Sequence, residues 1–112
     1  MSDFRGLRLV LFRLGDQTCG APASAVREVI PAALATRIPG ADLAVAGLVN
    51  LRGGLLTVID GRRVLDRTGG TGAAESVLVL EADGKVVGVA VDEVLDLIEI
   101  DADTMASGAD LP

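Results

Sequence analysis

Hydrophobic residues in this chain gather in short, nearly unbroken runs separated by turn residues. The first run, Leu7 to Leu14, is apolar at nearly every position and is short. A run of this kind favours a strand buried on both faces over a surface helix. Gly15 to Gln17 then predicts a turn, and Thr18 to Ala21 predicts the returning strand of a hairpin.

Two short helical segments are predicted next. Pro22 and Ser24 are typical of a helix start, and Pro31 limits the length of the segment. Asp42 to Gly47 resembles a single helical turn, with Asp42 as its N-cap. Within the first segment, three apolar residues fall at helical spacing: Val26, Val29 and Ile30.

The stretch "GLVNLRGGLLTVID" predicts a hairpin with strands at Leu48–Leu51 and Leu55–Ile59. We expect Gly53-Gly54 to form its two-residue turn, because glycine accepts the positive φ angles of mirror-image turns. Asn50 and Arg52 stand two residues apart, which places them on one face of a strand. An arginine beside a turn is often only solvated, but its planar fork is also a preferred interface anchor.

The second half of the chain predicts three more strands. "GGTGAAE" at residues 69–75 predicts a linker, and Asp83-Gly84 predicts the turn of a hairpin between Ser76–Glu81 and Lys85–Val91. A third strand is predicted at Val94–Ile100, and residues 101–112 show no period. The fold class is therefore mainly β, as small barrels or a sandwich, with one or two short helices. Two barrels packed side by side explain why so many strand positions are apolar.

Composition restricts the function. The 112 residues suffice for one domain, and a hydrophobic fraction of 50% against 23% charged predicts a real core. The chain has no histidine, tryptophan or tyrosine and a net charge of −6, which disfavours catalysis by a histidine base and binding to nucleic acid. Cys19 is the single cysteine and is expected to be a small buried hydrophobe. No apolar run is long enough to span a bilayer, and the N-terminus does not resemble a signal peptide, so we expect a cytoplasmic protein.

Weaker motifs give no catalytic or cofactor site. "GGTG" lacks the Lys-Ser or Lys-Thr of a phosphate-binding loop, and the acidic run from Asp92 to Asp103 lacks calcium-loop spacing. The serines have no histidine to activate them. We therefore expect no enzyme activity, no metal and no cofactor.

Several segments together resemble CheW-like domains, the coupling proteins of bacterial chemotaxis. They are "LVLFRLGDQTCGAPASAVREVI", "TRIP", "GLVNLRGGLLTVIDGRRVL" and "KVVGVAVDEVLDLIEI", and they span about residues 9–100. The resemblance implies two intertwined SH3-like five-stranded barrels within a single domain, 1–112. We expect a first sub-barrel at about 7–68, a linker at 69–75, second sub-barrel strands at 76–100, where that barrel is incomplete, and a loose tail at 101–112.

The resemblance also implies a non-catalytic adaptor. In the family, such domains couple the cytoplasmic tips of chemoreceptors, the methyl-accepting chemotaxis proteins, to the regulatory domain of a CheA-type histidine kinase, without entering the membrane. The receptor helix lies in an apolar groove between the barrels, which places this chain at receptor arrays. By position, eight residues are expected at this interface: Val26, Glu28, Gly47, Asn50, Arg52, Gly53, Val87 and Val89. Arg52 and Asn50 would orient the bound helix.

Part of this set has a purely structural interpretation. Gly47 and Gly53 are explained equally by backbone geometry, and Val26, Val87 and Val89 by membership of the core. Family members typically continue for some 40 residues beyond the position of Pro112 with elements that close the fold. We expect this short form to form a homodimer through the edge left exposed, or to let a partner supply the missing element. Two alternatives remain open: a receptor-binding module without kinase binding, and a regulatory module for another signalling protein.

Overall fold

The structure, a computed structural model, describes residues 6–64 and 74–101. Within them the chain is almost entirely β, with one single-turn α-helix, α1 (Gly61–Val64), and two 3-10 turns at Ala23–Ala25 and Ala32–Leu34. None of these helices is long and apolar enough to cross a bilayer. The strands are β1 (Gly6–Leu14), β2 (Gln17–Pro22), β3 (Val26–Pro31), β4 (Val45–Leu51), β5 (Gly54–Asp60), β6 (Ser76–Ala82), β7 (Lys85–Val91) and β8 (Glu93–Asp101).

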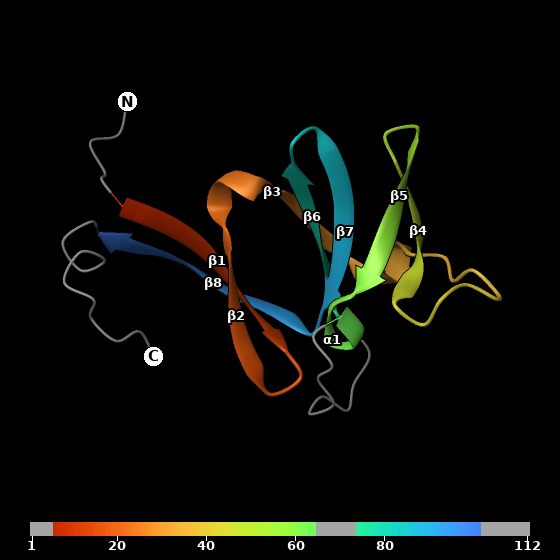
Figure 1. Ribbon diagram of the computed structural model, residues 1–112, viewed down its shortest axis with the longest axis horizontal. Helices are drawn as coiled ribbons and strands as arrows, with labels where there is room; N and C mark the ends of the chain where they lie inside the picture. The colour runs from red at the N-terminus through yellow and green to blue at the C-terminus, as the bar shows by residue number, and fades with distance from the viewer. Residues whose placement is uncertain (1–5, 65–73, 102–112) are drawn as a thin grey trace.

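The strands form two sheets that lie side by side (Figure 1). The smaller sheet has the order β2-β1-β8, and the larger has the order β3-β6-β7-β5-β4. All pairs are antiparallel except β5 with β7. The expected mainly β fold is confirmed, and in the described residues the two expected barrels correspond to one sheet of five strands and one of three. The expected boundary at 69–75 does not separate the sheets, because β3 pairs with β6 and β1 pairs with β8 across it.

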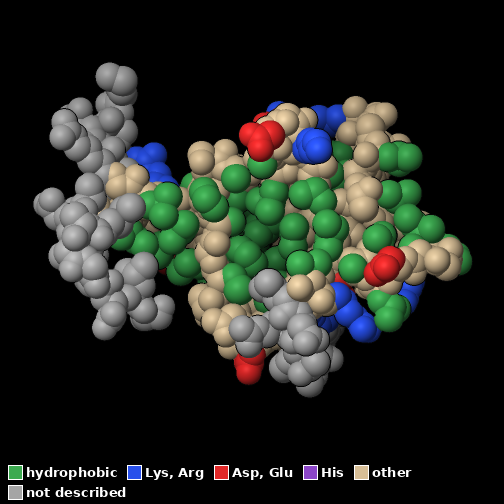
Figure 2. All heavy atoms as spheres, in the orientation of Figure 1, with side chains coloured by type: hydrophobic (Ala, Val, Ile, Leu, Met, Phe, Trp, Pro, Cys, Tyr) green, Lys and Arg blue, Asp and Glu red, His purple; other side chains and the backbone are tan. Residues whose placement is uncertain are grey.

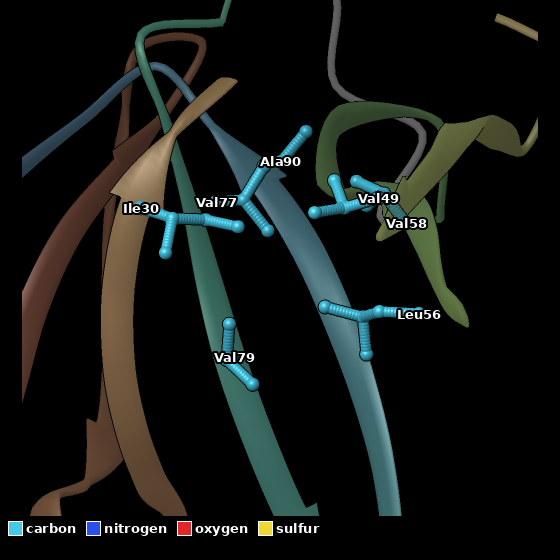
Figure 3. Close-up of a cluster of buried hydrophobic side chains, with 7 residues drawn as sticks. All are labelled: Ile30, Val49, Leu56, Val58, Val77, Val79 and Ala90. Atoms are coloured by element: carbon cyan, nitrogen blue, oxygen red, sulfur yellow. The ribbon is translucent and has the colours of Figure 1, made fainter. Parts of the chain in front are cut away.

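The larger sheet curls around one hydrophobic core, and we call it the barrel. All five of its strands contribute inward-facing side chains, which point toward one another in Figure 3. Because successive side chains of a strand point to opposite faces, all five strands can direct one set of side chains into a single core only when the sheet curves. The buried members are Ile30, Val49, Leu56, Val58, Val77, Val79 and Ala90.

A second core fills the space between the barrel and the smaller sheet. It joins Phe12 and Leu14 of β1 to Leu78 of β6 and Val91 of β7. Strand β6 is therefore buried on both faces, with Val77 and Val79 inside the barrel and Leu78 outside it, all at 1% exposure or less. Covering both faces of one strand accounts for its unbroken apolar run.

The helical segment expected from Pro22 to Pro31 is wrong. A 3-10 turn occupies Ala23–Ala25, and β3 begins at Val26. The segment is too short for apolar spacing to separate helix from strand, and pairing with β6 decides in favour of the strand.

The helical turn expected at Asp42–Gly47 is also wrong, although its cap is present. The Asp42 carboxylate Oδ1 accepts a hydrogen bond from the Ala44 N–H at 2.8 Å, and the Asp42 carbonyl accepts one from Val45 N–H at 2.9 Å. These bonds close one turn, after which β4 begins at Val45. Most of the expected linker, and the expected tail beyond Asp101, lie outside the described residues.

Candidate functional site

The turn between β4 and β5 differs from the expected one by a single residue. Leu51 pairs with Gly54, so the two turn residues are Arg52 and Gly53, with φ angles of 50° and 83°. Positive φ at both positions is the mirror-image geometry that fits strand twist, and it is unfavourable for a non-glycine residue. Arg52 therefore stands at the tip of the hairpin instead of continuing the face of β4.

Arg52 forms an ion pair with Glu28 of β3, another residue of the expected interface. The Arg52 Nη1 donates a hydrogen bond to the Glu28 Oε2 at 2.6 Å. The Arg52 side chain is 73% exposed, whereas that of Glu28 is 26% exposed. The hydrogen bond from Arg52 to Glu28, followed by their charge attraction, raises the pKa of the guanidinium. One edge of the guanidinium is thus fixed, while the rest of this large side chain faces solvent.

A β-bulge in β3 directs Glu28 to this place. Val26 pairs with Leu80 and Glu28 with Val79, so the register shifts at Arg27. Val79 faces the barrel interior, and Leu80 packs against the core between the sheets. Because paired residues share a face, Glu28 lies at the barrel end and Val26 on the opposite face of the same sheet. In a regular strand Val26 and Glu28 would lie on the same face, and the bulge places them on opposite faces.

The ion pair borders an open cavity of about 300 Å³ at this end of the barrel, which we call the Arg52 cavity. Leu56 and Val79 form its apolar base, and they lie at one end of the core cluster in Figure 3. The rim adds Leu55, which is 74% exposed, and Val86, which is 40% exposed. The lining residues are Arg27, Glu28, Leu51, Arg52, Gly54, Leu55, Leu56, Val79 and Val86.

The three valines of the expected interface lie on the outer face of the barrel instead. Val26, Leu80 and Val87 are successive cross-strand partners on β3, β6 and β7 and form one row. Val26 and Val89 pack against the core between the sheets, and both are half-buried. Through Val26 and Leu80 this row borders the core between the two sheets.

Gly47 and Asn50 do not line the Arg52 cavity. Gly47 is buried in β4, and a Cβ there would meet the Thr36 carbonyl oxygen at 2.5 Å. Its lack of a side chain lets residue 36 pair with β4 through the Thr36–Leu48 bridge. Asn50 is exposed and pairs with Leu55 across the hairpin. The shift of the turn removes the shared strand face expected for Asn50 and Arg52.

Of the residues that line the Arg52 cavity, sequence reasoning identified only Glu28 and Arg52, and the most exposed apolar residues that it missed are Leu55 and Val86. Each follows a two-residue turn, Arg52-Gly53 or Asp83-Gly84, in which both residues have positive φ. An apolar residue so close to a hairpin tip has little neighbouring structure to bury it. This position beside a turn is the sequence feature that could have identified both residues as exposed apolar contacts. Within the described residues, no group of three histidine, cysteine, aspartate or glutamate side chains is arranged to hold a metal ion.

Comparison with known proteins gives the family. A chemotaxis protein CheW of Rhizobium meliloti (strain 1021) is 36% identical over 100 residues, covering 85% of this chain and 62% of the relative. A probable chemotaxis protein CheW of Rhizobium etli is 34% identical over 97 residues, covering 82% of this chain and 60% of the relative. The chain thus spans about 60% of the length of these curated relatives.

The fold agrees with these sequence matches. The crystal structure of the scaffolding protein TtCheW from Thermoanaerobacter tengcongensis superposes with a TM-score of 0.79 at 28% identity, covering 88% of this chain and 68% of that one. A family model described as the CheW-like domain matches residues 8–111. The chain therefore belongs to the CheW-like domain family.

Proposed function

We propose that this chain is a non-catalytic adaptor of bacterial chemosensory signalling. In this proposal it binds the cytoplasmic tip of a chemoreceptor and couples it to the regulatory domain of a CheA-type histidine kinase. It acts in the cytoplasm at receptor arrays. Membership of the CheW-like family supports the proposal, as do relatives named as chemotaxis and scaffolding proteins.

The chemistry of the Arg52 cavity supports recognition of a helix. An amphipathic helix that docks in a groove needs apolar contacts along one face and polar contacts that fix its register. Leu55, Leu56 and Val86 supply the apolar contacts. The exposed guanidinium of Arg52 supplies the polar one, and its fork suits backbone carbonyls or carboxylates of the partner.

Glu28 has a positioning role in this proposal. An isolated arginine at a hairpin tip loses considerable side-chain entropy when it binds a partner. The 2.6 Å contact with Glu28 restricts the side chain before binding and so lowers that cost. The outward-facing row of Val26 and Val87 extends the apolar surface along the junction of the sheets. The Arg52–Glu28 pair at the rim of an apolar cavity is the observation that carries the proposal.

Isothermal titration calorimetry tests it directly. The purified chain is titrated with a receptor tip fragment and, separately, with the kinase regulatory domain. Arg52→Ala is expected to weaken receptor binding about tenfold or more, as expected for an interface anchor, with a nearly unchanged melting temperature. Arg8→Ala is the matched control, because Arg8 forms a comparable exposed pair with Glu99 on the other sheet.

Each result distinguishes among the candidates. Binding to both partners supports the adaptor, and binding to the receptor alone supports a receptor-binding module. Binding to neither refutes both and favours a regulatory module for another signalling protein. A large fall in melting temperature for Arg52→Ala with unchanged binding would make Arg52 a structural residue.

A further inference from the structure

A second cavity of about 400 Å³ opens at the opposite end of the barrel, beside α1. Val58, Val77 and Ala90 line it, whereas Leu56 and Val79 line the Arg52 cavity. Figure 3 shows these two sets of core residues at different ends of the cluster. The two cavities are therefore separate sites on one barrel. We call this one the Arg63 cavity.

Basic residues dominate the charge of the Arg63 cavity. Of the described residues, three arginines line it, Arg37, Arg62 and Arg63, against one carboxylate, that of Asp60. Figure 2 shows Lys and Arg side chains gathered in this region beside α1. The concentration is notable in a chain whose net charge is −6. An acidic ligand repelled by most of the surface would meet favourable charge here.

Two of these arginines have no counter-ion among residues 6–64 and 74–101. Arg62 lies near the buried carboxylate of Asp92, with its Nη1 3.7 Å from Oδ1, and its backbone N–H donates to Asp60 Oδ1 at 3.0 Å. Arg37 and Arg63, by contrast, form no ion pair or side-chain hydrogen bond with the described residues. Five other arginines of the described chain do form ion pairs with aspartate or glutamate: Arg8, Arg13, Arg27, Arg52 and Arg62.

Exposed apolar side chains accompany these two cations. Leu43 lines the cavity and is 66% exposed, and Val64, which follows Arg63 in α1, is 60% exposed. The base of the cavity consists of core side chains from three strands. Arginine combined with accessible large apolar residues around a concave surface is a typical composition of a protein-binding site.

We propose that the Arg63 cavity binds an acidic segment of another protein, in which carboxylates flank an apolar side chain. The apolar side chain enters the cavity against Leu43, Val45 and Ala46, above the buried core, and the flanking carboxylates meet the guanidinium groups of Arg37 and Arg63. A guanidinium binds a carboxylate through two parallel hydrogen bonds, which favours such a segment over a diffuse acidic surface. This inference does not depend on receptor or kinase binding, because it concerns the other end of the barrel.

Fluorescence anisotropy with a labelled pentapeptide, Glu-Glu-Leu-Glu-Glu, tests the inference on the purified chain. Two further peptides test the chemistry: Lys-Lys-Leu-Lys-Lys reverses the charge, and Glu-Glu-Ser-Glu-Glu removes the apolar anchor. The variant is Arg37→Gln/Arg63→Gln. Its matched control is Arg8→Gln/Arg27→Gln, which makes the same change of net charge at arginines that lie elsewhere and are paired with Glu99 and Glu81.

We expect the acidic leucine peptide to bind, with affinity falling as salt is raised because ion pairs at the rim are screened. The Arg37→Gln/Arg63→Gln variant should bind about tenfold more weakly, and the control should stay within about twofold of the wild type. Replacing leucine by serine in the peptide should also weaken binding about tenfold. Circular dichroism melting should give similar transitions for all variants, because both substituted residues are exposed.

Three results would overturn the inference. They are failure of the wild type to bind the acidic leucine peptide, equal affinity of the Arg37→Gln/Arg63→Gln variant, and equal affinity for the serine peptide. Displacement of the peptide by an equal concentration of free glutamate would assign the cavity to small carboxylates and refute a protein segment. An Arg52→Ala protein that retains peptide binding but loses receptor binding would separate this site from the proposed receptor site.

Discussion

Val26 and Glu28 are separated by one residue in β3, yet their side chains lie on opposite faces of the sheet. The bulge at Arg27 turns Val26 toward the core between the sheets and Glu28 toward Arg52 at the barrel end. Substitutions at these neighbouring positions should therefore affect different properties of the protein.

We expect Val26→Ala to lower the free energy of unfolding by about 1 kcal/mol, because it removes methyl groups packed against the core. Glu28→Gln should change stability by less than about 1 kcal/mol, since the partner arginine is largely exposed. Glu28→Gln should instead weaken receptor-tip binding. Urea denaturation and calorimetry of both variants measure the contrast, and equal loss of stability in the two would contradict it.

Arg52 combines an unfavourable backbone conformation with an exposed charge, and two substitutions separate these properties. Arg52→Gly should stabilise the fold by about 1 kcal/mol, because glycine accepts the φ angle of 50° without steric cost. Arg52→Ala retains the steric cost and should not stabilise. Both should lose receptor binding to a similar extent. The comparison needs thermal melts and one titration for each protein, and recovery of binding in the glycine variant would show that the guanidinium is dispensable.

Gly47 is expected to be required for folding. Gly47→Ala would place its Cβ 2.5 Å from the Thr36 carbonyl oxygen, so the Thr36–Leu48 bridge must open or the strand must shift. We expect a loss of about 1–3 kcal/mol, as for overpacking in a tight interior. Gly54→Ala is the control, because the nearest atom to its Cβ is 3.7 Å away. A destabilised Gly54→Ala protein beside a normal Gly47→Ala protein would refute this assignment.

The core between the sheets should be sensitive to charge. Val89 of β7 packs against this core, and Val89→Asp introduces a carboxylate without a partner there. Placing a charged group in such surroundings costs several kcal/mol, so the variant should unfold or aggregate. Thr57→Asp, at an exposed position of β5, should fold normally. Circular dichroism and size-exclusion chromatography distinguish these outcomes, and a soluble, cooperative Val89→Asp protein would show that the site tolerates solvent.

The elements that the sequence predicted well have strong local determinants. Asp83 and Gly84 have φ angles of 54° and 78°, as a mirror-image turn requires. The strands on either side of this turn, β6 and β7, pair as the expected hairpin. Gly15 likewise has a positive φ of 62° in the first hairpin turn. Where turn chemistry is strong and the flanking runs are apolar, local sequence determines both strand and register.

The incorrect predictions concern features whose structure is determined by tertiary contacts. The turn could consist of either Arg52-Gly53 or Gly53-Gly54, because arginine or glycine occupies all three positions. The pairing of Leu51 with Gly54 selects Arg52-Gly53. The bulge at Arg27 depends on the partner strand β6, about fifty residues later in the chain, so no local pattern predicts it. The Arg52–Glu28 contact depends on both of these features. Family resemblance placed the two residues in one site, but it did not predict their ion pair.

The pairing of β1 with β8 has a consequence for synthesis of the protein. Gly6 is opposite Asp101, so the smaller sheet cannot close until β8 has left the ribosome. Until then β1 lacks one of its two neighbouring strands and is available to chaperones or to misfolding. Limited proteolysis of stalled nascent chains should show residues 6–22 becoming protected only after residues 93–101 emerge.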